Sequence, residues 1–278
     1  MDETFKNCPI GVFDSGIGGL TVVKELLKVL PHEHIIYFGD TARLPYGSKS
    51  NNLINQYSLE NSIFLYSKNV KMIIIACNTA SATSSDYLRN FIKIPVIGVI
   101  ECGALGAVRH TKNKRVGVIG TKSTINSHAY SKTIQTLDPE IKVFEFSTPL
   151  LVHLVEENWI EKDITNSILE QYMNPLLEND IDTLILGCTH YPLLKKQIRA
   201  ITGKISLVDS SHEVALLVLN TLGILNIIST REESGQIKVF LSDIHPEFPT
   251  WANGFLEKKI TTSLVNLDNH GLLEGSRT

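Results

Sequence analysis

Two short stretches decide the fold, Ile73-Ile-Ile-Ala-Cys-Asn-Thr79 and Leu184-Ile-Leu-Gly-Cys-Thr189. Each is a run of mostly branched apolar residues that ends in a cysteine followed by a polar residue. An apolar run without alternation is typical of a strand buried on both faces, as in a parallel sheet. The two stretches therefore predict two equivalent buried strands, each with a cysteine at its carboxyl end.

Similar apolar runs alternate with amphipathic segments along the chain. The predicted strands are 10–13, 34–38, 72–76, 96–99, 116–119, 142–146, 183–186, 205–208 and 237–241, and the predicted helices include 20–30, 52–67, 164–177 and 213–222. Strands that alternate with helices indicate an α/β fold with parallel sheets.

Two further pairs of strands repeat at an offset of roughly one hundred residues, in the same order as the cysteine stretches. Ile10-Gly-Val-Phe13 is similar to Val116-Gly-Val-Ile119, and Ile35-Ile-Tyr-Phe38 is similar to Ile141-Lys-Val-Phe144. We therefore expect two similar α/β domains with mainly parallel sheets flanked by helices, related by a pseudo-twofold axis. The expected domains are residues 1–100 plus 210–278 and residues 101–209, with the active site in the cleft between them.

Composition narrows the class of protein. The chain has 278 residues, 43% of them hydrophobic, and its 26 Lys and Arg against 29 Asp and Glu give a formal net charge of −3. This balance does not favour a nucleic-acid partner, which selects a basic surface. No apolar run reaches the ~18 residues of a membrane span, and the N-terminus lacks a signal-peptide pattern. We expect a cytoplasmic protein with no membrane partner, whose four cysteines are free thiols.

The two repeated cysteines differ from the other two, Cys8 and Cys102, which we expect to fill the core. In open parallel sheets ligands bind beyond the carboxyl ends of the strands, and a following helix N-terminus favours a thiolate. Two such thiols on two similar halves would face each other across the cleft. Opposed acid and base groups are what inversion of a stereocentre requires, so Cys77 and Cys188 are the candidate pair.

Polar residues near these cysteines could assist the proton transfer. Asp14 ends the first strand, and His190 follows Cys188 by two residues. The turn Asp14-Ser-Gly-Ile-Gly-Gly19 lacks both the full dinucleotide pattern and the Walker lysine, so it favours a small anion such as a carboxylate. The loop Gly39-Asp-Thr-Ala-Arg-Leu-Pro-Tyr-Gly47 also follows a strand and is a candidate for substrate contact.

These two segments, together with Ala76-Cys-Asn-Thr-Ala-Ser81 and Gly187-Cys-Thr-His-Tyr-Pro192, resemble the signature blocks of the bacterial glutamate racemases. The resemblance covers nearly the whole chain, with the blocks in the family's order and spacing. It implies interconversion of L- and D-glutamate without a cofactor or metal, which supplies D-glutamate for peptidoglycan synthesis. We also expect a homo-oligomer, specifically a dimer.

The resemblance assigns roles residue by residue. It implies that Cys77 and Cys188 are the proton donor and acceptor, with Asp14 and His190 as auxiliary groups that also contact substrate. The further substrate-binding positions that it implies are Ser15, Tyr46, Gly47, Asn78, Thr79, Thr124, Glu156 and Thr189. The chain departs from the family's pattern at Cys102, Thr148 and His153.

Three alternatives remain at this point. The first is a racemase of the same superfamily that acts on aspartate or another amino acid, in which only the pocket would differ. The second is a non-catalytic protein that binds an acidic amino acid between two lobes, for which a cysteine on each lobe has no purpose. The third is a hydrolase with a cysteine nucleophile, which would leave Cys77 unexplained.

Overall fold

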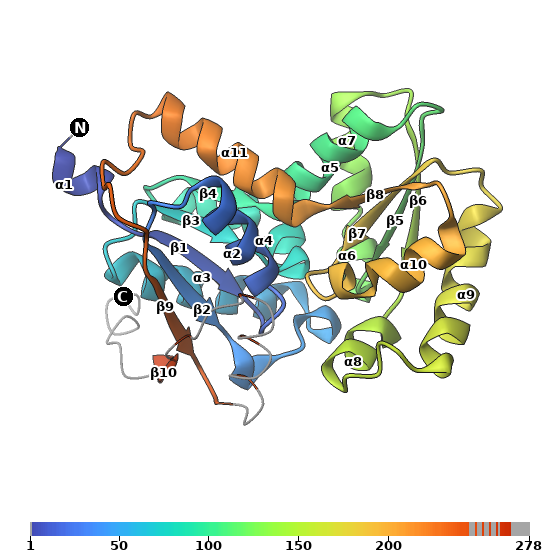
Figure 1. The fold of residues 1–278 in the computed structure, drawn as a ribbon, viewed down its shortest axis with the longest axis horizontal. Helices are drawn as coiled ribbons and strands as arrows, with labels where there is room; N and C mark the ends of the chain where they lie inside the picture. The colour runs from blue at the N-terminus through green and yellow to red at the C-terminus, as the bar shows by residue number, and fades with distance from the viewer. Residues whose placement is uncertain are drawn as a thin grey trace.

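Two parallel sheets flanked by helices form the protein, so the expected α/β class is confirmed. The structure is a computed structural model that describes residues 2–244, 248, 252, 256, 260 and 262–267. Most of the tail assigned to the first domain, from 245 onward, lies outside these residues. Figure 1 shows the two sheets in two halves that lie side by side.

The first sheet contains six strands in the order β10-β9-β2-β1-β3-β4, and all its neighbouring strands are parallel. Its strands are β1 (Ile10–Asp14), β2 (Ile35–Gly39), β3 (Met72–Ile75), β4 (Val96–Gly98), β9 (Ile237–Leu241) and β10 (Thr262–Leu264). The predicted strand at 96–99 ends one residue early, because Val99 begins a helix.

The second sheet contains four parallel strands in the order β6-β5-β7-β8. Its strands are β5 (Arg115–Gly120), β6 (Lys142–Ser147), β7 (Thr183–Gly187) and β8 (Ser206–Asp209). This order repeats β2-β1-β3-β4 of the first sheet, strand for strand. The three pairs of similar segments in the sequence thus correspond to β1 with β5, β2 with β6 and β3 with β7.

Helices connect the strands and cover both sheets. They are α1 (Glu3–Lys6), α2 (Leu20–Val29), α3 (Asn51–Ser67), α4 (Asn78–Phe91), α5 (Val99–His110), α6 (Lys122–Asn126), α7 (Ala129–Leu137), α8 (Leu150–Glu156), α9 (Asp163–Leu177), α10 (Lys195–Thr202) and α11 (Ser210–Ile224), with 3-10 turns η1 (Thr41–Arg43), η2 (Tyr46–Ser48) and η3 (Tyr191–Leu194). Helix α11 leaves the second sheet at β8 and packs on α2 and α5 (Figure 1). The chain therefore returns from the second half to the first along α11.

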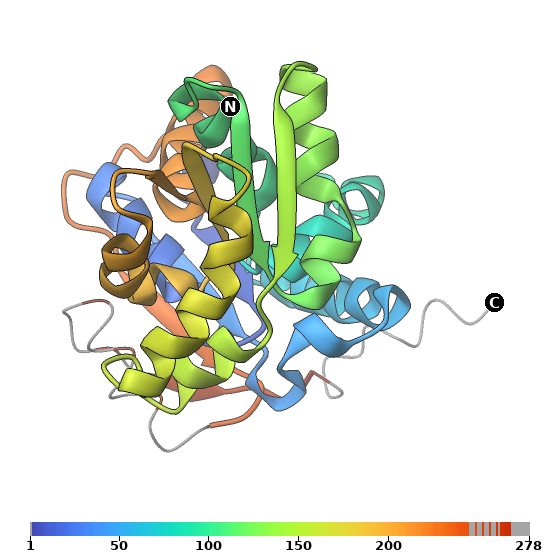
Figure 2. The same cartoon turned by 90° about the vertical axis from the view of Figure 1, so that its right-hand side faces the viewer.

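The carboxyl ends of both sheets point into the space between the halves. In Figure 2, β5 and β6 run down toward the loop that contains η1 and η2 of the first half. Turns that follow strands in one half consequently lie close to turns that follow strands in the other. A site at this boundary draws on both halves, as expected for ligands beyond the carboxyl ends of parallel strands.

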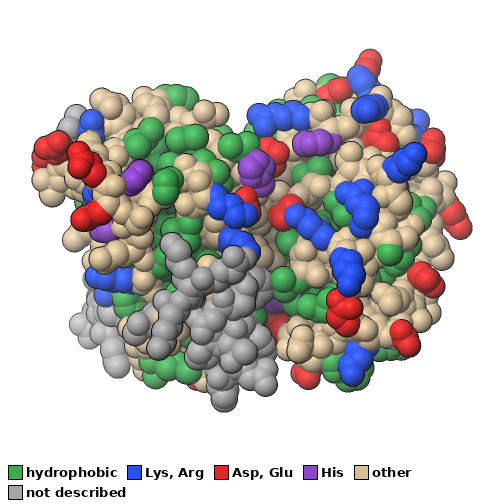
Figure 3. Space-filling view, viewed as in Figure 1, with side chains coloured by type: hydrophobic (Ala, Val, Ile, Leu, Met, Phe, Trp, Pro, Cys, Tyr) green, Lys and Arg blue, Asp and Glu red, His purple; other side chains and the backbone are tan. Residues whose placement is uncertain are grey.

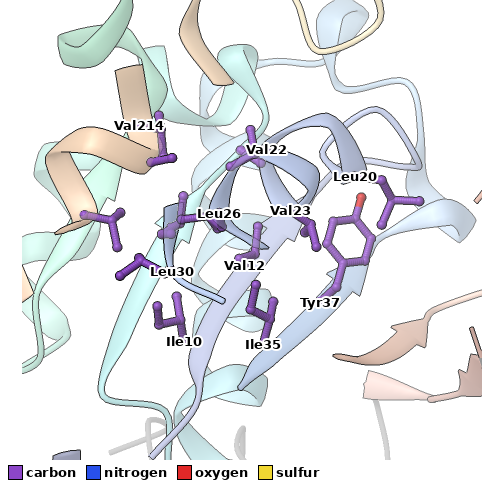
Figure 4. Packing of buried hydrophobic residues seen from close by; sticks show 14 of the residues in the cluster. Ile10, Val12, Leu20, Val22, Val23, Leu26, Leu30, Ile35, Tyr37 and Val214 are labelled. Carbon is purple, nitrogen blue, oxygen red and sulfur yellow. The ribbon is translucent and has the colours of Figure 1, made fainter. Parts of the chain in front are cut away.

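The core of the first half illustrates why α2 forms where it does. Its apolar residues Leu20, Val23 and Leu26 recur at helical spacing and are fully buried against β1 (Figure 4). Val214 of α11 joins the same cluster, which fastens α11 to this half. Shortening Leu26 to alanine would cost about 2–5 kcal/mol of unfolding free energy, since it leaves a cavity.

A buried ion pair lies at the opposite end of the first sheet, next to the amino end of β3. The Lys71 ammonium lies 2.6 Å from Glu33 Oε2 and also donates to the carbonyl oxygens of Lys6 and Ile227 at 2.6 and 2.8 Å. Both side chains are essentially fully buried. The pair ties the N-terminal segment and the residues after α11 to the sheet.

The surface has no single dominant charge on the face seen in Figure 3, where acidic and basic side chains are interspersed over the second half. Among the residues that the structure describes, no helix combines the length and apolar composition needed to cross a bilayer.

Candidate active site

A cavity of about 170 Å³ lies between the two halves, at the carboxyl ends of both sheets. Both repeated cysteines, Cys77 and Cys188, line it. The other predicted site residues that line it are Ser15, Tyr46, Gly47, Asn78, Thr79, Glu156, Thr189 and His190. The site is thus assembled from segments more than one hundred residues apart in the sequence.

Cys77 follows β3 and caps the N-terminus of α4, where its sulfur accepts the backbone N–H of Ala80 at 3.5 Å. Its thiol points to the Ser15 hydroxyl oxygen, 3.7 Å away. Burial, reinforced by the negative charge of Asp14, raises the pKa of the Cys77 thiol to about 12. Cys77 is therefore protonated at neutral pH.

Asp14 lies directly behind this cysteine and does not line the cavity. It is fully buried, and its Oδ2 accepts the Gly16 N–H at 3.0 Å. Burial raises the pKa of the carboxyl group, an effect that the nearby His190 charge partly opposes. Asp14 also accepts a long hydrogen bond of 3.5 Å from the Thr189 hydroxyl, which belongs to the opposite half.

Cys188 follows β7 and is held by a different set of partners. His190 Nδ1 lies 3.7 Å from the Cys188 sulfur, and His190 Nε2 lies 3.3 Å from Glu156 Oε1. Burial alone would lower the pKa of His190, but its interactions with Cys188 and Glu156 outweigh burial and raise the pKa to about 10. His190 is therefore positively charged at neutral pH, between a sulfur and a carboxylate.

Hydroxyl groups from both halves meet at one wall of the cavity. Thr79 Oγ1 lies 2.9 Å from Thr121 Oγ1 and 3.3 Å from Thr124 Oγ1. Thr124 is itself buried behind Thr121, 3.0 Å from its hydroxyl, and does not line the cavity. Of the predicted substrate contacts, Thr124 and Asp14 thus lie behind the cavity wall and support the residues that form it.

Tyr46 and Gly47 form the part of the wall that comes from η2. The Tyr46 hydroxyl points away from the cavity, where it donates to Asp40 and accepts from Asn61 Nδ2 at 3.0 Å. Gly47 packs against the second half so closely that an added Cβ would lie 2.7 Å from Thr121 Cβ. Tyr46 therefore offers its ring and backbone to a ligand, and Gly47 lets the loop approach the other half.

Several lining residues were missed by sequence reasoning, chiefly Thr121, Lys122 and His153. A signal for Thr121 was present, because the internal repeat aligns the segment after β5 with the segment after β1. Ser15 follows β1 as Thr121 follows β5, so both strand ends could have been assigned to the site. His153 lies on α8 one turn before Glu156, with its Nδ1 4.0 Å from Glu156 Oε2, so the assignment of Glu156 to the site could have indicated it.

The arrangement offers proton-transfer chemistry to a small polar ligand. Two thiols approach one cavity from different halves, and hydroxyl and amide groups with the N-terminus of α4 are suited to bind carboxylates. Within the described part of the chain, no group of three His, Cys, Asp or Glu side chains is arranged to hold a metal ion.

Comparison with known proteins adds independent information. The family model described as Asp/Glu/Hydantoin racemase matches residues 10–218. The glutamate racemase of Geobacter metallireducens is 46% identical over 252 residues, which cover 90% of this chain and 93% of that protein.

Solved structures of two glutamate racemases align with almost the whole of this chain. The glutamate racemase of Francisella tularensis, determined in complex with D-glutamate, is 39% identical with a TM-score of 0.89, covering 95% of this chain and 99% of that one. The glutamate racemase isoform RacE1 of Bacillus anthracis is 37% identical with a TM-score of 0.91, covering 94% and 98%. With the family model matching well over half of its residues, the chain belongs to the Asp/Glu/Hydantoin racemase family.

Proposed function

We propose that this protein interconverts L-glutamate and D-glutamate by moving the α-proton between two thiols, Cys77 and Cys188. One observation carries this proposal, namely that cysteines from equivalent strand ends of two similar halves line a single cavity. The curated relatives support glutamate as the substrate, since they are glutamate racemases at 46% and 45% identity over most of their length.

The chemistry requires one sulfur as a base and the other as an acid. A thiolate accepts the α-proton as the Cα–H bond breaks, and the bonding electron pair delocalises into the α-carboxyl group. The thiol on the opposite face then gives its proton to Cα, which forms the new C–H bond with inverted configuration. The sulfurs exchange roles for the reverse reaction, so no external acid or base is consumed.

The partners of each sulfur suit this exchange. The charged His190 beside Cys188 stabilises negative charge on that sulfur, and Glu156 in turn keeps His190 charged and oriented. On the other side, the raised pKa of Cys77 keeps this thiol protonated at neutral pH, as the acid in the transfer must be. We assign Asp14 to proton positioning at Cys77 through Ser15 and the glycine turn.

Substrate binding falls to the remaining lining residues. Glutamate carries two carboxylates and one ammonium group, and the cavity wall contributes Ser15, Asn78, Thr79 and Thr189 beside the N-terminus of α4. Tyr46 and Gly47 close the wall, and we assign Thr124 to holding the hydroxyls of Thr79 and Thr121 in place.

The decisive experiment uses the purified protein with L-glutamate in deuterated water and no added cofactor. We expect loss of optical rotation together with incorporation of deuterium at Cα, and we expect a much slower reaction with L-aspartate. Faster reaction with L-aspartate would assign the chain to the aspartate alternative. Binding of glutamate without deuterium exchange would favour the non-catalytic alternative, and release of ammonia or another hydrolysis product would favour a hydrolase.

The proposal extends to the domains, the compartment and the assembly of the protein. We propose domains at residues 1–100 plus 210–278 and 101–209, which agrees with sheet membership among the described residues. We also propose a cytoplasmic homodimer that supplies D-glutamate for peptidoglycan. Sedimentation of the purified protein measures the dimer directly, and a monomeric mass at working concentration would refute it.

A further inference from the structure

Tyr130, on α7, is fully buried and does not line the cavity, yet it contacts the residue next to each cysteine. Its hydroxyl accepts a hydrogen bond of 2.8 Å from Asn78 Nδ2, and Asn78 immediately follows Cys77. Its ring packs on the backbone of Gly187, where an added Cβ would lie 3.2 Å from Tyr130 Cε2. Gly187 immediately precedes Cys188, so this one side chain spans the two cysteine loops.

The hydroxyl of Tyr130 belongs to a short buried chain of hydrogen bonds. Tyr130 Oη lies 3.2 Å from Ser210 Oγ at the start of α11. Burial raises the pKa of Tyr130 above its usual value, so the hydroxyl keeps its proton. The Tyr130 oxygen thus accepts from Asn78 Nδ2 and shares a second hydrogen bond with Ser210, in which either hydroxyl can donate.

This chain of hydrogen bonds sets the orientation of the Asn78 side-chain amide toward a ligand. An asparagine amide has two kinds of group, a donor NH₂ and an acceptor oxygen. With one N–H of Nδ2 bonded to Tyr130, the orientation of the cavity-lining amide is set, and its oxygen and second N–H remain for a ligand. A buried amide held in this way loses little freedom when a ligand binds, since its orientation is already set.

Close packing around the ring indicates that its place is tightly defined. Gly103 on α5 leaves the space that the tyrosine and Ser210 fill, because a Cβ there would lie 3.0 Å from Tyr130 Cε1 and 2.6 Å from Ser210 Oγ. Tyr130 is thus enclosed by α5, α11 and the strand end that carries Cys188.

We propose that Tyr130 is a positioning residue for racemisation, which orients Asn78 beside Cys77 through its hydroxyl and spaces the Cys188 loop through its ring. This inference rests on the proposed glutamate racemisation. It assigns a role to a residue outside the cavity, and it predicts that the hydroxyl acts through Asn78.

The test is a double-mutant cycle of Tyr130→Phe and Asn78→Ala, with exchange of the α-proton in deuterated water followed by NMR over hours. Tyr130→Phe keeps the ring and should lower kcat/KM about tenfold, the effect of one lost orienting hydrogen bond. In the Asn78→Ala background the same change should lower kcat/KM less than about twofold, because the hydroxyl then has no amide to orient. Circular dichroism confirms that each variant is folded.

Controls separate this role from a general packing effect. Tyr87→Phe makes the same chemical change on α4, the helix that begins with Asn78, and should leave kcat/KM unchanged. An equal fold-loss from Tyr130→Phe with and without Asn78 would overturn the proposal, as would no loss in the wild-type background. If α-proton exchange by Asn78→Ala is too slow to measure, calorimetry gives the Kd of D-glutamate for the wild type, the two single variants and the double variant. Tyr130→Phe should then weaken binding more in the wild-type background than in the Asn78→Ala background, and an equal effect in both would overturn the proposal. A wild-type protein that does not racemise glutamate would instead overturn the proposed function.

Discussion

The loops that carry Cys77 and Cys188 occupy equivalent places in two similar sheets but have different surroundings. Cys77 caps a long helix and has a buried carboxyl group, Asp14, behind it. Cys188 leads into the 3-10 turn η3 and has His190 beside it, backed by Glu156. The repeat therefore places two sulfurs alike, while side chains outside the repeat make them chemically unlike.

This difference shows how a nearly symmetric fold can give its two halves different protonation states. A negative neighbour and burial keep the proton on Cys77, whose pKa is about 12. On the other side, the histidine of pKa about 10 holds positive charge next to sulfur. We propose that these unlike surroundings distinguish the two sulfurs, since proton transfer at one carbon requires one acid and one base.

The largest expected effect comes from removing either sulfur. Cys77→Ser and Cys188→Ser should each lower kcat for racemisation by about 10³-fold or more, because a positioned acid or base contributes about 10²–10⁴-fold. Polarimetry with L- and D-glutamate measures the loss. If either variant keeps a rate near that of the wild type, the two loops do not act as a pair.

Replacing the histidine tests the charge on the Cys188 side. His190→Gln should lower kcat/KM about 10²-fold, since it removes the positive charge but keeps a polar side chain. In the wild type, activity should fall as pH rises through about 10, where His190 loses its proton. The pH profile of kcat/KM for both proteins is the measurement, and a wild-type profile without this alkaline fall contradicts the assignment.

The same histidine predicts a dependence of stability on pH. Its folded pKa of about 10 lies above the unfolded value of 6.5, so its contribution is complete below pH 6.5 and is lost as pH rises to about 10. Urea unfolding of the wild type should lose more stability over this window than unfolding of His190→Gln does. Parallel curves for the two proteins would show that His190 is not charged in the folded state.

A smaller effect is expected from the carboxylate behind the histidine. Glu156→Gln should lower kcat/KM about tenfold or less, because it removes a supporting charge from His190 and leaves both thiols in place. The alkaline fall of activity should move below pH 10, since the pKa of His190 drops without its carboxylate. If activity of Glu156→Gln falls at the same alkaline pH as that of the wild type, Glu156 does not raise the pKa of His190.

The smallest expected effect concerns the contact between the halves at η2. Gly47→Ala should raise KM for glutamate a few-fold, because the new methyl group would meet Thr121 at 2.7–3.1 Å. Adding Thr121→Ser removes the Thr121 methyl group, which lies 2.9 Å from the new Cβ, and should recover part of the loss. Gly223→Ala is the matched control, with no heavy atom nearer than 3.9 Å. Equal KM values for Gly47→Ala and this control would mean that the contact does not shape the cavity.

The fold was largely predictable because buried parallel strands leave a strong sequence signal. The apolar runs at 10–13, 72–76 and 183–186 became β1, β3 and β7 with shifts of one residue at most. The order of strands within each sheet has no local signal, since it depends on which buried faces meet. The boundary at Val99 was missed because this valine suits a strand but begins a buried helix.

The site was predictable where it follows strand ends and less so elsewhere. Asp14, Cys77 and Cys188 stand at or shortly after such ends; both cysteines line the cavity, and Asp14 lies behind Cys77. Tyr130 on α7 reaches the site region through the packing of a whole helix, which no spacing of residues encodes. The Tyr46 hydroxyl likewise points away from the cavity because it bonds to Asp40 and Asn61, which only the folded loop brings together.

The buried Lys71–Glu33 pair lies at the amino end of the first sheet, away from the cavity, and serves stability rather than catalysis. The Lys71 ammonium group donates to acceptors from three distant segments. Removing either partner would leave an unpaired charge buried in the interior. Substitutions there should reduce the amount of intact protein in a cell while the surviving molecules keep their specific activity. A screen that scores abundance would therefore identify residues at the amino end of this sheet, and a screen that scores turnover would identify residues at its carboxyl end.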